Sequence, residues 1–395
     1  MDYGVPKLLL GFLGACIYGD AAAFYRALDE SDRAALEKQG RTHLQQAWMY
    51  RFLYDVLPEE HRAKYRQFYQ VRHAQAVQGG YELNKFYAEL NARGVRFVPI
   101  KGADLTWRIY TDAALRHGND WDIWFHPDDC DKALEVLAET GWTVPPLYSD
   151  KNDAVFKTAQ HHYSPHIRGS YTVEPHYTLA NFVGIDPREL WAYTMEFPGG
   201  GGHSVLTSEM NVLMLARHAA SRSYYHAQLP KLLTDVAMVM RHDDIDFAKI
   251  RMMSERWGLP YPGDLLAAFP EFFPPEIITK FDANPEKTAL FRTIFESRGE
   301  IGEPDTTKLT MDRARAHGNA FSFVANHIHS LSPGTIRRIY RIPKHGAWGR
   351  VFLSYLDYFW TRTTRVFASF LGANRKMSDY CRLVESVESP RTGSH

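Results

Sequence analysis

Hydrophobic positions in the first part of the chain recur every three or four residues. This spacing runs through RTHLQQAWMYRFLYDVL (41–57) and through GGYELNKFYAELNARG (79–94), where Gly94 follows the last apolar position. Such a period places apolar side chains on one face of a helix, and a glycine just after the periodic run is a common helix end. The pattern therefore predicts an N-terminal helical region over residues 1–94.

The period then changes to two. Alternating or β-branched runs occur in VRFVPI (95–100), DWDIWF (120–125) and YTVEPHYTLA (171–180). Each run predicts a strand, although Pro175 in the last one favours an edge strand or a bulge. The segment 126–142 between them has a helical pattern that starts near a proline and ends at a glycine. Strands and helices in this succession predict a compact α/β core over residues 95–198.

Helical periodicity returns after the glycine-rich segment FPGGGGHS (197–204), which the sequence predicts to be a linker. Apolar faces run through TSEMNVLMLARHAA (207–220) and AQLPKLLTDVAMVMRH (227–242), which predicts a C-terminal helical domain over residues 203–390. His218 and Asp235 lie inside these apolar helices and need partners. We expect them to bond each other or to meet through Arg217. The whole pattern predicts an α+β fold, with a small mixed sheet and flanking helices between two helical regions.

Charge and cysteine content narrow the class of protein. Lysine plus arginine and aspartate plus glutamate number 46 each, so no net field indicates nucleic acid or an anionic membrane as partner. No run reaches the roughly 18 apolar residues of a membrane span. The three cysteines are far apart, which is typical of reduced thiols in a cytoplasmic protein. The basic, aromatic segment 335–376 is either a packed helix pair or a surface for an anionic partner such as RNA or membrane.

Two aspartates, Asp120 and Asp122, lie one residue apart on a strand that is otherwise apolar. Alternate residues share a face, so both carboxylates point the same way while Trp121, Ile123 and Phe125 point the other. Like charges so placed repel, and they need either solvent at a turn or a cation between them. Because of this repulsion, the sequence predicts that Asp122→Asn leaves the metal-free stability level or raises it.

A D-x-D strand that follows a strand ending in Lys-Gly, with a further acid on a later strand, is the layout of a nucleotidyltransferase site. Two Mg²⁺ ions about 3.5–4 Å apart need shared, hard oxygen ligands. Glu174 is the candidate third acid because it is one carboxylate among apolar neighbours in the same α/β core. If Glu174 points elsewhere, the third acid is to be sought among Asp150, Asp153 and Asp186.

The segment from VRFVPIKG to LAETGW (95–142) resembles the core of the uncharacterised nucleotidyltransferase family of the DNA polymerase β superfamily. Its members carry a hydrophobic strand, a Lys-Gly turn, a short helix, an arginine and then Asp-x-Asp. VEPHY (173–177) is similar to the later acidic strand of the family, and 215–240 to its C-terminal helices. In place of the Gly-Ser signature of the wider superfamily this chain has Lys-Gly. The resemblance implies a small polymerase-β-like core.

The resemblance also implies roles for individual residues. A phosphate-facing, nucleotide-binding turn would be formed by Lys101 and Gly102, and the metal ligands and catalytic acids would be Asp120, Asp122 and Glu174. Arg116 is expected either to bind the triphosphate or to neutralise the aspartates. His176 shares a strand face with Glu174 and is expected to orient it.

These expectations describe an enzyme that moves an NMP from an NTP to an acceptor hydroxyl and releases pyrophosphate. Its cofactor would be two Mg²⁺ ions, with Mn²⁺ able to substitute, and its acceptor a protein, an RNA or a small molecule. One alternative is a catalytically inactive nucleotide- or partner-binding module with the same fold. Another is a zinc hydrolase built on the histidines close in sequence, which are His161, His162, His166 and His176.

Overall fold

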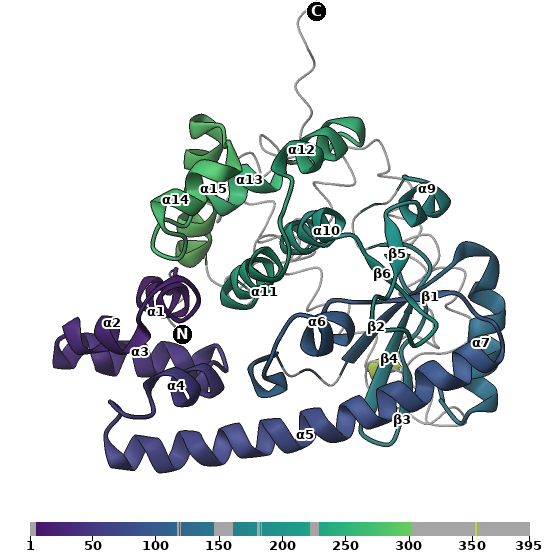
Figure 1. Ribbon diagram of the computed structural model, residues 1–395, viewed down its shortest axis with the longest axis horizontal. Helices are drawn as coiled ribbons and strands as arrows, with labels where there is room; N and C mark the ends of the chain where they lie inside the picture. Colours follow the sequence, from purple (N-terminus) through teal and green to yellow (C-terminus); the bar gives the residue numbers. More distant parts are fainter. Residues whose placement is uncertain are drawn as a thin grey trace, which may run out of the picture.

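The long helix α5 (Glu59–Ala92) joins the N-terminal helices to the rest of the protein. A computed structural model of the 395-residue chain describes residues 5–116, 118, 120–145, 161–179, 182, 184–221, 229–301 and 352–353. Before α5 come α1 (Lys7–Tyr18), α2 (Ala21–Ala27), α3 (Glu30–Thr42) and α4 (Gln46–Leu53). Figure 1 shows α5 running from these helices to the sheet. The helical periods found at 41–57 and 79–94 correspond to α4 and to the second half of α5.

Aspartate caps start two of the N-terminal helices. The Asp20 side chain accepts a hydrogen bond from the backbone N–H of Ala23, and Asp29 does the same for Asp32. Such a cap satisfies one of the backbone donors that the first turn of a helix leaves without a partner. The sequence thereby fixes where α2 and α3 begin.

A four-stranded mixed sheet follows, with strand order β1-β2-β4-β3. Its strands are β1 (Phe97–Ile100), β2 (Asp120–Phe125), β3 (His166–Arg168) and β4 (Tyr171–His176). β2 and β4 are parallel, and the other two pairs are antiparallel. The helical segments among them are α6 (Gly102–Arg108), η1 (Ala113–Arg116), η2 (Pro127–Asp129) and α7 (Cys130–Glu139).

Pro175 does not mark an edge strand, which was one of the two positions, edge or bulge, that the sequence favoured for it. β4 lies between β2 and β3 in the sheet. The β3 ladder, however, ends at Val173, two residues before Pro175. The proline therefore sits beyond the pairing with β3, where its missing N–H does not interrupt that ladder.

The two faces of β2 enter different hydrophobic cores. Trp121, Ile123 and Phe125 pack with the second half of α5 and with α7. Trp124, on the opposite face, belongs to the larger core formed by the N-terminal and C-terminal helices. The alternation read from the sequence is confirmed, and Asp122 lies on the face of Trp124.

The glycine-rich segment is a hairpin loop and not the linker that the sequence predicted. It connects β5 (Thr194–Glu196) and β6 (Ser204–Leu206), which pair antiparallel after the short helix α9 (Pro187–Trp191). Gly202 has φ +72°, and a Cβ there would lie 2.9 Å from the Asn91 amide. Asn91 donates to the carbonyl of Gly201 at 2.6 Å. Glycine is needed because the loop turns with positive φ against the end of α5.

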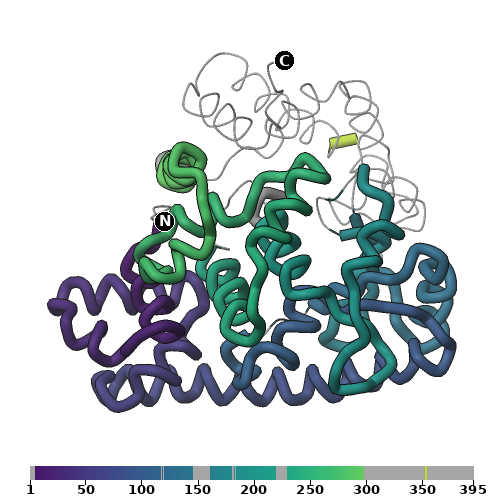
Figure 2. The backbone as a smooth tube through the Cα atoms, turned by 45° about the horizontal axis from the view of Figure 1, so that its top comes forward, coloured from purple at the N-terminus to yellow at the C-terminus, as the bar shows by residue number. Residues whose placement is uncertain are grey.

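The C-terminal helices share one core with the N-terminal ones. They are α10 (Ser208–Ser221), α11 (Leu229–His242), α12 (Phe247–Arg256), α13 (Pro262–Leu266), α14 (Pro275–Ile278), η5 (Thr279–Phe281) and α15 (Pro285–Ile301). Leu10 and Phe12 of α1 belong to the same buried cluster as Val236 of α11 and Phe272. The tube in Figure 2 shows the N-terminal helices, in purple, near the last described helices, in bright green.

None of the helices in the described ranges is long and apolar enough to cross a membrane. The basic, aromatic segment 335–376 lies outside the described residues except for Phe352 and Leu353, which are exposed. Its proposed anionic partner therefore stays a prediction.

Candidate functional site

The site begins where β1 ends. Lys101 follows Ile100 with φ +52° and ψ −125°, a left-handed backbone conformation that costs a non-glycine residue about 1–3 kcal/mol. This conformation turns the chain sharply from β1 into α6. The Lys101 ammonium reaches Asp122 on the neighbouring strand, where Nζ lies 2.7 Å from Oδ1.

Asp122 is the most strongly held acid of the site. Its Oδ1 accepts hydrogen bonds from Lys101 Nζ at 2.7 Å and from His176 Nε2 at 2.9 Å. The Asp122 side chain is 6% exposed and that of Lys101 11%. Burial alone raises the pKa of a carboxyl group, but the two donors reverse this and hold the pKa of Asp122 well below its usual range. Asp122 is therefore an ionised carboxylate in the fold.

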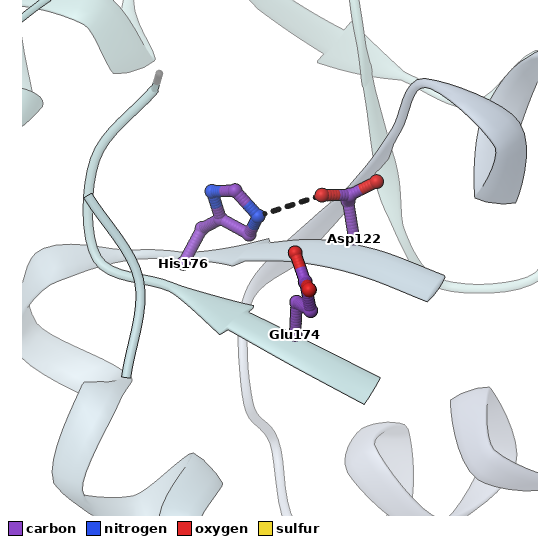
Figure 3. Close-up of side chains that lie close together, drawn as sticks. All are labelled: Asp122, Glu174 and His176. Atoms are coloured by element: carbon purple, nitrogen blue, oxygen red, sulfur yellow. Dashed lines mark hydrogen bonds and ion pairs between the residues drawn. The ribbon is translucent and has the colours of Figure 1, made fainter. Parts of the chain in front are cut away.

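Strand register brings Glu174 beside Asp122. The two residues are directly paired across the parallel β2–β4 ladder. Their carboxylate oxygens and a ring nitrogen of His176 all lie within 4.8 Å of one another. Figure 3 shows the three side chains converging on one face of the sheet. A pair of hard carboxylates at this separation is suited to a divalent cation.

Asp120 stands apart from this group. It is the exposed first residue of β2 and lies opposite Thr172. It makes no ion pair within 4 Å in the part of the chain that the structure describes, although its charge acts on Arg116 and Lys231. The two aspartates share a face, as expected, but the positive charge of Lys101 already compensates Asp122.

His176 is fully buried and orients Asp122, where the sequence predicted Glu174 as its partner. Because Asp122 is ionised, Nε2 of His176 carries the proton and donates it to the hydrogen bond. Burial lowers the pKa of His176 to about 4 in spite of the adjacent carboxylate. Nδ1 has no hydrogen-bond partner among the described residues. The imidazole is thus neutral and fixed in one tautomer.

The rings of His161 and His162 lie 5.1 and 5.4 Å from that of His176. Within the described ranges, the group with metal-binding separation contains His176 with the two carboxylates and none of the other histidines. This does not support the zinc hydrolase. Among the alternative third acids, Asp186 caps α9 at Arg188, while Asp150 and Asp153 lie outside the described residues.

Arg116 is buried and forms an ion pair with Asp235 of α11, with Nε 2.6 Å from Oδ1. The same oxygen accepts from the Tyr110 hydroxyl at 2.8 Å. The sequence led us to expect His218 or Arg217 as partners of Asp235, whereas these two partners come from the core and tie α11 to it. A Cβ at Gly102 would lie 3.1 Å from Nη1 of Arg116, so glycine allows the guanidinium to lie against the Lys101–Gly102 turn.

Lys231 is a residue that the sequence analysis missed. It lies in the first turn of α11, and the charge of Arg116, followed by burial, lowers its pKa to about 8. Asp235 acts on it in the opposite sense, and so to a smaller extent do Asp120 and Asp122. A signal existed: cations are disfavoured at a helix N-terminus, and Lys231 is the single basic residue of an apolar stretch there.

The comparison with known families identifies the class of protein. A model described as "Uncharacterised nucleotidyltransferase" matches residues 26–267, more than half of the chain. The chain belongs to the uncharacterised nucleotidyltransferase family. The match reaches from the N-terminal helices through α5 and the sheet to α13, so it includes part of each helical region that flanks the site. No curated protein and no solved structure matches the chain.

Proposed function

We propose that the protein is a magnesium-dependent nucleotidyltransferase with a small polymerase-β-like core, which transfers an NMP from an NTP to an acceptor hydroxyl. The observation that carries this proposal is the pairing of Asp122 with Glu174 across β2 and β4 beside Lys101. Family membership supports the class of reaction. The acceptor is a protein, an RNA or a small molecule.

The residues present suit Mg²⁺ better than a softer metal. The donors nearest one another include two carboxylates, and hard oxygen ligands favour Mg²⁺, with Mn²⁺ as a substitute. The imidazole of His176 turns its protonated nitrogen toward Asp122 and therefore serves to orient the carboxylate. Asp122, Glu174 and the exposed Asp120 would hold the ions. When bound, Mg²⁺ offsets the charge that develops on the phosphate oxygens.

The chain's own groups supply positioning and charge. The depressed pKa of Asp122 keeps it ionised at neutral pH, ready to bind a cation. Lys101 stands at the turn into α6 and offers a compact positive charge to the phosphates of an NTP. In the transfer, the acceptor oxygen bonds to the α-phosphorus and the bond to the β-phosphate bridging oxygen breaks. Pyrophosphate leaves with that electron pair, and the hydroxyl proton passes to a carboxylate of the site.

The proposal is tested by incubating the protein with each α-labelled NTP, Mg²⁺ and a cell extract that supplies acceptors. We expect one pool of protein, RNA or small molecule to become labelled, and we expect Asp122→Asn to abolish the labelling. Asp186→Asn, which makes the same chemical change at the exposed cap of α9, is the matched control and should label normally. Equal labelling by the parent and Asp122→Asn would rule out this site.

One observation favours the alternative of a nucleotide-binding module without catalysis. The ammonium of Lys101 already neutralises Asp122 at the place where a metal ligand is needed. If that ion pair persists with nucleotide bound, the protein binds an NTP but does not turn it over. Calorimetric titration with NTP and Mg²⁺, followed by assay of the same sample for pyrophosphate, separates binding with turnover from binding alone.

A further inference from the structure

A cavity of about 190 Å³ adjoins the site on the side of Arg116. It lies where the α3–α4 turn, α5, η1 and α11 meet. Its walls are formed by His43, Leu44, Gln45, Phe68, Arg72, Ala114, Leu115, Arg116, Lys231 and Thr234. Arg116 lines this cavity and its guanidinium also lies against Gly102, so one side chain connects the cavity wall with the Lys101–Gly102 turn.

Three arginine and lysine side chains line the cavity, and only one of them forms an ion pair within 4 Å among the described residues. Arg116 is compensated by Asp235. Arg72 and Lys231 are only partly exposed, and neither forms an ion pair with any residue that the structure describes. Arg72 instead lies over the ring of Phe68, 5.1 Å from its centroid. Because burying uncompensated charge is costly, such a wall favours an anion inside.

Both Arg72 and Lys231 lie in surroundings that disfavour their positive charge, which supports the same conclusion. The positive charge of Arg116 is the largest cause of the lowered pKa of Lys231, and burial lowers the pKa of Arg72. Both residues would recover favourable interactions if an anion with several acceptor oxygens bound between them. A water molecule occupies about 30 Å³ of liquid, so the cavity has room for several waters or for a phosphate group.

We propose that this cavity is a phosphate-binding subsite in which Arg72 and Lys231 hold a phosphate group of a substrate. The inference rests on the proposed nucleotidyl transfer for the nature of that substrate. The phosphate comes either from the end of the NTP or from a phosphorylated acceptor. Arginine binds phosphate oxygens through its planar fork of donors and lysine through its point charge, so the two residues are complementary.

The first experiment uses inorganic pyrophosphate as the probe and needs no activity. Calorimetry with the full chain in EDTA should give saturable binding, and Arg72→Met and Lys231→Met should each weaken it about tenfold or more. The matched controls are Arg66→Met and Lys64→Met, which change exposed cations on α5. These controls should bind like the parent. Lys231→Arg keeps the charge and should retain most of the affinity, which separates lost charge from misfolding.

Three results would overturn the subsite: no binding of pyrophosphate by the parent, unchanged affinity in both cavity variants, or equal losses in the controls. The source of the phosphate is decided by repeating the titration with an NTP and with its nucleoside. If Arg72→Met and Lys231→Met bind the NTP more weakly than the parent but bind the nucleoside equally well, the subsite holds a phosphate of the NTP. Unchanged NTP binding, with pyrophosphate binding still weakened, assigns it to a phosphorylated acceptor. Pyrophosphate binding without any NTP turnover would leave the subsite standing and refute the transfer reaction.

Discussion

Replacing Asp122 with Asn should destabilise the metal-free protein, although the sequence alone predicts level or greater stability. The change keeps the volume of the side chain but removes a charge that lies 2.7 Å from the Lys101 ammonium, with the two side chains 6% and 11% exposed. Removing one partner of a buried ion pair costs about 3–5 kcal/mol because the other charge is left uncompensated. Asn retains one acceptor oxygen and Glu174 lies nearby, so we expect a loss of about 2 kcal/mol.

The assay is urea unfolding of the parent and the variant at pH 7 in EDTA. Asp120→Asn is the matched control, because it makes the same chemical change two residues away at an exposed position. Its stability should stay within about 0.5 kcal/mol of the parent. The double variant Asp122→Asn/Lys101→Met should lose less unfolding free energy than the two single variants lose together, because both changes remove the same ion pair. If Asp122→Asn is as stable as the parent or more stable, carboxylate repulsion outweighs the ion pair and our account of Asp122 is wrong.

Three further changes test other parts of the structure by the same unfolding assay. Lys101→Gly should be about 1 kcal/mol more stable than Lys101→Ala. Both variants lose the ion pair, but only glycine relieves the strain of the positive φ. Equal stability of the two variants would show that the turn is unstrained. Asp235→Asn should cost about 3 kcal/mol, because Arg116 stays buried without its counter-charge; a loss below 0.5 kcal/mol, within the surface range, would contradict the pairing. The pKa of His176 is about 4 in the fold and about 6.5 in the unfolded chain. Between these pH values the unfolded chain binds a proton that the folded protein does not. His176 therefore lowers the free energy of unfolding as the pH falls from 6.5 to 4. His176→Gln should therefore lose less stability than the parent between pH 7 and pH 4.5, and parallel losses would show that this histidine titrates normally.

Local patterns in the sequence were sufficient for several of the helices and for the faces of the central strand. The three-to-four-residue period predicted α4 and the end of α5, and alternation placed Trp121 and Ile123 opposite Asp122. These features depend on residues only a few positions apart in the chain, so the spacing of apolar residues is enough to predict them. The hairpin at 197–204 was mistaken for a linker because short strands of three residues leave little alternation to detect.

The contacts that define the site depend on residues far apart in the chain. Asp235 lies 119 residues from Arg116, and its partner could not be found from the apolar helix around it. Lys101 pairs with Asp122 because an unusual backbone turn directs its side chain across the sheet, and that turn has no sequence signature beyond the following glycine. The strand register that sets Glu174 beside Asp122 likewise follows from the whole sheet and not from either segment alone.

We propose that Asp122 and Glu174 act together in metal-dependent transfer. The most direct measurement is the rate of label transfer from α-labelled NTP to the acceptor pool, followed over a series of Mg²⁺ concentrations for the parent and for Glu174→Gln. We predict transfer that requires Mg²⁺, and a rate in the variant that falls far more than its NTP affinity, because Asp120 and Asp122 would still hold the nucleotide's metal. Transfer by Glu174→Gln at the parental rate and the same Mg²⁺ concentration would contradict the account.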